Sequence, residues 1–102
     1  MSVLNPTPPD RLVDARGRPY FLWDVETTLD QFRGMLAGED RAVRAYLIAK
    51  LMRQARPDDV FQFVTVEDIR EEWPRIERHL GRTRGFWTWI LDAWDGERTD
   101  AA

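Results

Sequence analysis

Most apolar residues after Thr27 recur at intervals of three and four positions, and the clusters they form are bounded mainly by helix-capping residues, glycines and prolines. Such spacing places apolar side chains on one side of an α-helix, because the helix completes a turn about every 3.6 residues. The glycines and prolines keep each of these helices short. The sequence therefore predicts a mainly α fold, a single small orthogonal bundle of four to five short helices.

The first two helices have clear start and stop signals. Thr27 or Thr28 can cap the first helix, and Gly38 is expected to end it. A second helix is predicted from about Asp40 to about Ala55, where the proline that follows prevents its continuation.

The next two helices are less regular. A short one is expected after Asp58 or Asp59, and a longer one over residues 65–80 with Thr65 at its start. Pro74 interrupts the longer helix, so that it either kinks there or restarts with the proline in its first turn.

The residues before these helices lack helical periodicity. Residues 1–10 contain three of the six prolines and no periodic pattern, which predicts a disordered or loosely packed tail. Residues 12–22 are typical of a short β-hairpin, in which Asp14 opens the turn and Gly17 supplies the positive φ that closes it. Pro19 would keep the second arm at an edge.

The length of 102 residues predicts one domain, which we place at residues 11–96, followed by a frayed tail at 97–102. The absence of cysteine excludes disulfides and thiolate chemistry. The first residues do not resemble a signal peptide and no apolar stretch is long enough to span a bilayer, so a cytoplasmic location is expected. A net charge of −3 argues against a general nucleic-acid binder.

Asp24 and Glu26 form a D-x-E-T-T motif after an apolar stretch. The motif resembles the first motif of proofreading-type 3′–5′ exonucleases, where two such carboxylates hold metal ions for phosphodiester hydrolysis. It resembles the nucleophile motif of haloacid-dehalogenase-like hydrolases more loosely.

Neither resemblance extends to the rest of the chain. His79 and Tyr46 are not followed by an acid at the spacing that the exonucleases need, and the chain is too short and too helical for a central sheet. We therefore expect the motif to start a helix, whose positive end acids suit. No catalytic residue, metal site or cofactor is predicted, and no enzyme activity is expected.

Residues 41–57 contain five basic residues and no acid. On a helix Lys50, Arg53 and Arg56 would share a face with Tyr46, opposite the apolar stripe. This basic face is either a site for an acidic partner or for phosphates, or a solvated surface balanced by the acids that follow in the sequence.

The last predicted helix, residues 86–94, is closed by Gly96 and is rich in tryptophan. Its apolar residues cover an arc of about 200°, whereas a helix on one side of a domain needs only about 100° or somewhat more. The apolar surface in excess of this arc is either buried on a second side of the helix or presented to a partner. Tryptophan is strongly enriched at binding hot spots, so Trp87, Trp89 and Trp94 are the first candidates for partner binding.

Residues 19–94, about three quarters of the chain, resemble a family of small, uncharacterised bacterial helical proteins encoded beside nucleotidyltransferase toxins of the abortive-infection type. The matching segments are 19–24, 45–49, 59–61, 64–65, Ile69, Trp73-Pro74 and the closing tryptophan-rich helix. The resemblance implies an antitoxin-like partner of such a toxin.

Three functions follow from these features. The leading hypothesis is a protein–protein interaction module, with a nucleotidyltransferase toxin as partner and homo-oligomers as an open alternative. A DNA-binding regulator of the helix-turn-helix type is the second, although the 65–80 helix carries five acids against three arginines. A degenerate nuclease built on Asp24 and Glu26 is a distant third.

Overall fold

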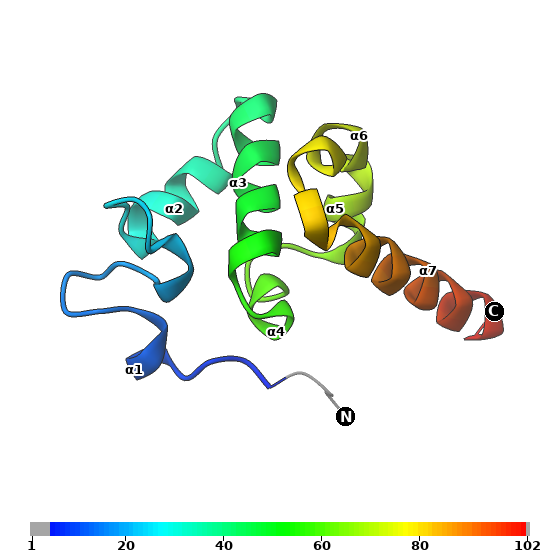
Figure 1. Cartoon of the computed structure of the whole chain (residues 1–102), viewed down its shortest axis with the longest axis horizontal. Helices are drawn as coiled ribbons and strands as arrows, with labels where there is room; N and C mark the ends of the chain where they lie inside the picture. The colour runs from blue at the N-terminus through cyan, green and yellow to red at the C-terminus, as the bar shows by residue number, and fades with distance from the viewer. Residues whose placement is uncertain (1–4, 102) are drawn as a thin grey trace.

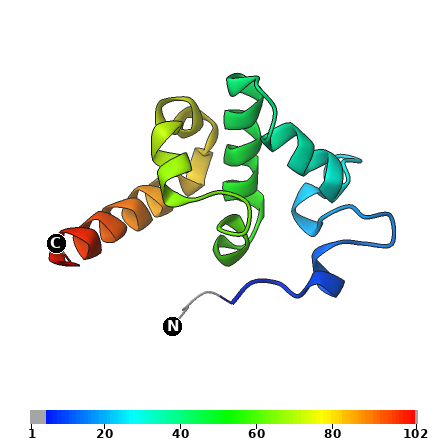
Figure 2. The ribbon, with the colours of Figure 1, turned by 180° about the vertical axis from the view of Figure 1, so that it is seen from behind.

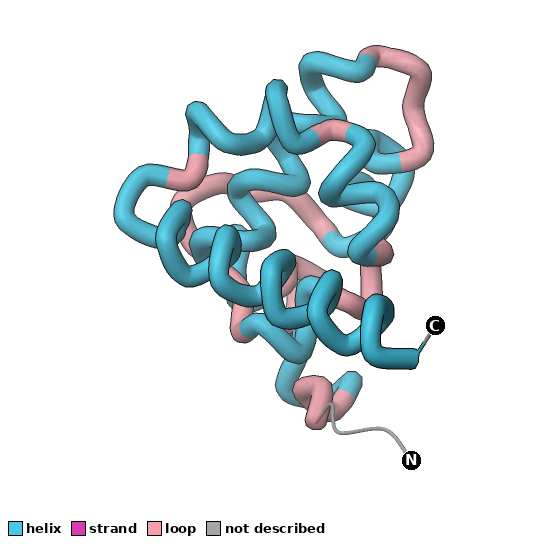
Figure 3. The backbone as a smooth tube through the Cα atoms, turned by 90° about the vertical axis from the view of Figure 1, so that its right-hand side faces the viewer, coloured by secondary structure: helices cyan, strands magenta, loops and turns pink. Residues whose placement is uncertain are grey.

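A computed structural model of the chain describes the backbone of residues 5–101 and the side chains of residues 5–94. Within this range the chain is mainly helical and contains no β-strand, as the sequence predicts (Figure 3). The helices of this range are α1 (Pro9–Leu12), the 3-10 helix η1 (Tyr20–Leu22), α2 (Leu29–Leu36), α3 (Arg41–Gln54), α4 (Pro57–Val60), α5 (Val66–Glu71), α6 (Trp73–Ile76), the 3-10 helices η2 (Glu77–His79) and η3 (Gly81–Thr83), and α7 (Arg84–Ala101) (Figure 1).

Helix α3 forms the centre of the molecule. Figure 1 and Figure 2 show η1 and α2 on one side of it and α5, α6 and α7 on the other. The Asp40 carboxylate caps α3 by accepting hydrogen bonds from the backbone amides of Ala42 and Val43. Every residue from Leu47 to Met52 is buried, because α3 is covered around most of its circumference. The predicted helix of about residues 40–55 is confirmed.

Helix α2 begins with a capping box, as its sequence predicts. The Thr28 hydroxyl accepts a hydrogen bond from the Gln31 amide, and the Gln31 side chain accepts one from the Thr28 amide. Phe32 of α2 packs edge to face against Phe21 and Phe63, with ring centroids 5.4 and 5.6 Å away. These three rings join α2, η1 and the segment after α4 into one core.

The long helix expected at 65–80 is divided. Thr65 and Asp68 form a second capping box, and α5 then ends at Glu71. Helix α6 restarts at Trp73 with Pro74 in its first turn, which is one of the two outcomes predicted for this proline. The division leaves Glu72 between the two helices, where its side chain is buried.

The N-terminal part differs from the prediction in two respects. The tail expected to be disordered or loosely packed includes residues 5–10, but Asn5 and Thr7 are held against α4 by hydrogen bonds, and Pro9–Leu12 form α1. Residues 1–4 lie outside the described residues. The hairpin is reduced to one antiparallel bridge between Val13 and Pro19.

The turn of this reduced hairpin has the predicted geometry, with Gly17 at a φ of 77°. The second arm coils into η1 instead of continuing as a strand. Pro19 has no N–H that could extend the ladder. The helical turn of η1 instead places both Phe21 and Leu22 in the core.

Helix α7 runs past the predicted stop at Gly96 and ends at Ala101. A glycine inside a helix costs only about 1 kcal/mol, so it weakens the helix without ending it. The backbone of the predicted frayed tail, 97–101, is therefore helical, and Ala102 lies outside the described residues. The C-terminal half of α7 projects from the other helices (Figure 1). No helix in the described part is sufficiently long and apolar to cross a membrane.

Candidate functional site

One side of α7 is part of the core. Trp87 is only 1% exposed, and its indole N–H donates a 2.9 Å hydrogen bond to the carbonyl of Met52 on α3. Its ring meets Phe61 edge to face. The carbonyl of Leu91 accepts a hydrogen bond from Arg70 of α5. Trp87 was predicted to contact a partner, and this placement corrects the prediction, since the indole is enclosed within the monomer.

Helix α7 also carries apolar side chains that the described part of the chain leaves exposed: Phe86, Trp89 and Ala93 lie away from the side that packs on α3, and Trp94 lies where the helix has passed the other helices. We call these exposed side chains the outer face, and they are Phe86, Trp89, Ala93 and Trp94, whereas Ile90 between them is half-buried against the core. The exposed fraction is 43% for Phe86, 64% for Trp89 and 42% for Trp94. Phe86, Trp89 and Ala93 follow one another at intervals of three and four residues, the spacing of an apolar stripe that packs against a second element.

The rings of the outer face support one another. The Phe86 ring lies 6.3 Å from that of Trp89 and 5.4 Å from that of Trp87. Phe86 therefore links the buried indole to the exposed one. Because their neighbours restrict their rotation, these rings lose less entropy on binding than isolated surface side chains would. The sequence predicted the apolar surplus of this helix, but only the packing against α3 separates Trp87 from Trp89 and Trp94.

The predicted basic face does not form. Lys50 is 5% exposed, and its ammonium group makes a 2.6 Å ion pair with the carboxylate of Asp24. Gln54 also donates to Asp24, at 3.3 Å. Lys50 is thus an internal link between α3 and the turn after η1, which corrects its prediction as a partner-binding residue.

The other three residues of the predicted basic face have different environments. Arg56 lies beyond α3, before α4, and its guanidinium contacts Thr7 and the Asn5 carbonyl. Tyr46 is half exposed and packs edge to face against His79, with centroids 5.7 Å apart. Arg53 is exposed.

Asp24 has a structural role in place of the metal binding that the exonuclease-like motif would require. The hydrogen bond from Lys50 holds the pKa of its carboxyl below the usual value. Glu26 is exposed. In the described part of the chain, no three histidine or acidic side chains are grouped as a metal ion would require.

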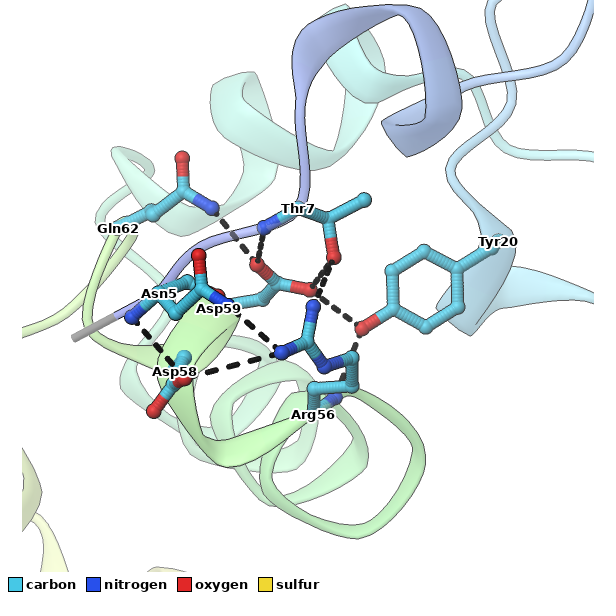
Figure 4. Close-up of polar contacts among 7 residues, drawn as sticks. All are labelled: Asn5, Thr7, Tyr20, Arg56, Asp58, Asp59 and Gln62. Atoms are coloured by element: carbon cyan, nitrogen blue, oxygen red, sulfur yellow. Dashed lines mark hydrogen bonds and ion pairs between the residues drawn. The ribbon is translucent and has the colours of Figure 1, made fainter.

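A buried carboxylate holds the N-terminal segment onto α4 (Figure 4). Asp59 is fully buried and accepts hydrogen bonds from the Thr7 amide at 2.7 Å, the Thr7 hydroxyl at 2.6 Å and the Tyr20 hydroxyl at 2.6 Å. Gln62 donates a fourth, at 2.9 Å. The sequence predicts Asp59 only as a candidate helix cap, because Tyr20 and Thr7 are 39 and 52 residues away, whereas the residue lies inside α4.

A second buried carboxylate, Glu72, connects α3 with the start of α6. Arg41 of α3 donates to its Oε1 at 2.8 Å, and the Arg75 guanidinium lies 3.6 Å from its Oε2. The hydrogen bond from Arg41 lowers the pKa of Glu72 more strongly than burial raises it. For Asp59, burial raises the pKa, but the hydrogen bonds from Thr7 and Tyr20 outweigh it and leave the pKa below the usual value.

These two carboxylates predict that the domain loses stability in acid. Both have a lower pKa in the folded than in the unfolded chain, so their contribution is complete above the unfolded values of 3.8 and 4.5 and is lost as the pH falls through the folded values. Urea unfolding should give a constant free energy between about pH 6 and 7 and a decline below about pH 4. Equal stability at pH 3 and pH 7 would show that neither carboxylate contributes.

No family model matches the chain, and no similar protein was found among the curated proteins or the solved structures. The function is therefore inferred from the surface itself.

Proposed function

We propose that this chain is a non-enzymatic protein–protein interaction module and that the outer face of α7 is its contact surface. The observation that supports this most directly is the exposure of Trp89, at 64%, beside Phe86 and Trp94. Exposed aromatic clusters of this kind on a small protein are typical of interaction sites. The burial of Trp87 strengthens the proposal, because it anchors the helix that presents the cluster.

A nucleotidyltransferase toxin is the partner that we propose to test first, on the basis of the family resemblance of residues 19–94. The outer face supplies apolar area. The nearest acid among the described residues of α7 is Asp92, which is exposed beside this face. Such a surface fits an apolar groove on a protein better than a phosphate backbone, which requires lysine or arginine.

The test is co-purification of the tagged chain with a nucleotidyltransferase toxin of the abortive-infection type, the partner that the resemblance implies. Trp89→Ala should abolish co-purification, because truncation of an exposed aromatic hot spot costs about 2 kcal/mol or more of binding energy. Trp23→Ala is the matched control, since Trp23 is 76% exposed but lies in the turn after η1. Circular dichroism should show both variants folded. Equal co-purification of Trp89→Ala and the native chain would contradict the proposed contact surface.

A further inference from the structure

A hollow lies beside the reduced hairpin, on the far side of α3 from α7 (Figure 1). Its volume is about 310 Å³, near the lower end of the range for small-molecule sites, which is enough for one ring system with a short substituent. Its lining comes from α1, the two arms of the hairpin, η1 and the turn after η1, and includes Arg11, Val13, Arg18, Leu22, Trp23 and Val25.

Most of the hollow is apolar. Pro19 and Leu22 line it and are themselves buried, so they form its floor. Trp23 and Val25 also line it, but they are 76% and 40% exposed, and Trp23 is the most exposed large apolar residue that the structure describes. Leaving this surface in water is unfavourable. A flat apolar molecule in the hollow would remove part of it from water.

Two arginines supply hydrogen-bond donors to the hollow. Arg11 is exposed, and its guanidinium has no ion pair or hydrogen bond within the described part of the chain. Arg18 pairs through Nε with the Asp14 carboxylate at 2.9 Å, so its two terminal nitrogens have no partner among the described residues. Two arginines against one aspartate give the lining a net charge of +1. A ligand with a single negative charge would therefore compensate it.

Contacts at the edges hold the hollow in shape. One carboxylate oxygen of Asp14 accepts hydrogen bonds from the backbone amides of Arg16 and Arg18, each at 2.9 Å. The Tyr20 hydroxyl, at the other end of the hairpin, is bonded to the buried Asp59. Because these walls are ordered before a ligand arrives, binding loses little entropy in the protein.

We propose that this hollow binds a small aromatic monocarboxylate, whose ring lies against Trp23 and whose carboxylate pairs with Arg11. An indole stacks on a flat apolar ring, and a guanidinium binds a carboxylate through two parallel hydrogen bonds. A phosphate monoester carries about 1.5 to 2 negative charges at neutral pH, more than the one uncompensated positive charge of the lining. The site is separate from the outer face and does not depend on the proposed function.

Nuclear magnetic resonance titration of the full chain with indole-3-acetate tests the site. The native chain should bind this probe with a dissociation constant below about 1 mM, with shifts of the Trp23 indole resonance. Indole-3-acetamide has the same ring without the charge and should bind at least about threefold more weakly. The absence of binding up to about 5 mM indole-3-acetate, or equal affinities for the acid and the amide, would overturn the inference.

The role of Arg11 is tested by its removal. Arg11→Gln should weaken the binding of indole-3-acetate at least about threefold and leave that of indole-3-acetamide unchanged, because only the acid has a charge for the guanidinium to pair with. Arg53→Gln is the matched control, since Arg53 is an exposed arginine on α3 that does not line the hollow. Equal losses in the two variants would show that only the net charge of the protein matters, and the assigned contact would be wrong.

The role of Trp23 is tested in the same way. Trp23→Ala should weaken the binding of the acid and of the amide alike, by about tenfold, because both present the same ring. Trp89→Ala removes an exposed indole from α7 and should change neither affinity. Circular dichroism should show all four variants folded, since each replaces an exposed side chain. Weaker binding in Trp89→Ala but not in Trp23→Ala would place the probe on the outer face and contradict the inference.

The two proposals fail separately, because the hollow and the outer face lie on opposite sides of α3 (Figure 1). A chain that loses the toxin in Trp89→Ala but does not bind indole-3-acetate would leave the interaction module standing and refute the ligand site. If Trp23→Ala loses the toxin and binds the probe like the native chain, the hollow is a protein contact and the ligand site is refuted. Binding of the probe that depends on Arg11 and Trp23, without any toxin contact, would support the ligand site alone.

Discussion

Replacing Trp87 with alanine should lower the free energy of unfolding by about 4 kcal/mol, the largest effect of any single change that we expect. The substitution empties a fully enclosed site between α7 and α3, and it leaves the Met52 carbonyl without its hydrogen-bond donor. A domain of this size has a free energy of unfolding of about 5–15 kcal/mol, so the substitution removes a large part of its stability. Thermal unfolding followed by circular dichroism should show a midpoint lower by about 15 °C or more.

Trp89→Ala is the matched control, because it removes the same indole from the exposed side of the same helix. It should change the free energy of unfolding by about 0.5 kcal/mol at most. If Trp87→Ala and Trp89→Ala lower the free energy of unfolding by similar amounts, α7 is not divided into a buried and an exposed side.

Replacing Asp59 with alanine should cost about 3 kcal/mol and release the N-terminal segment. The change removes one acceptor and leaves four donors without it: the amide and hydroxyl of Thr7, the Tyr20 hydroxyl and the Gln62 amide. Buried polar groups that lose their partner carry the full cost of desolvation. Hydrogen exchange should become fast at Thr7, whose amide is now bonded to the carboxylate.

Asp58→Ala controls for the loss of a neighbouring acid. Asp58 also binds this segment, through the Asn5 amide at 3.1 Å, but it is partly exposed to solvent. Its removal should cost less than about 1 kcal/mol, because water replaces the lost interaction. If Asp59→Ala is as stable as Asp58→Ala, the network around Asp59 does not hold the N-terminal segment in place.

The helix boundaries could be predicted where their causes are local. The capping boxes at Thr28 and Thr65 join residues three apart, and Pro74 acts on the turn that contains it. Gly96 is the exception, since a glycine permits a helix end without enforcing one. Pro19 ended the hairpin early for a reason already present in the sequence, its missing N–H.

The candidate site could be predicted only in part. The excess of apolar surface on the last helix follows from its sequence, because the arc exceeds what one contact can cover. The choice between Trp87 as core and Trp89 as surface depends on where α3 lies, and no periodicity within α7 specifies that. Lys50 was assigned to a basic surface for the same reason, since its partner Asp24 is 26 residues away.

The sequence by itself determined the helical class, most helix starts and the aromatic surplus of the last helix, all of which depend on residues within about one or two turns of each other. The tertiary structure decided which charges are internal and which rings remain outside. Lys50, Asp59 and Glu72 are buried because distant partners compensate their desolvation. Those partners become neighbours only when the helices pack.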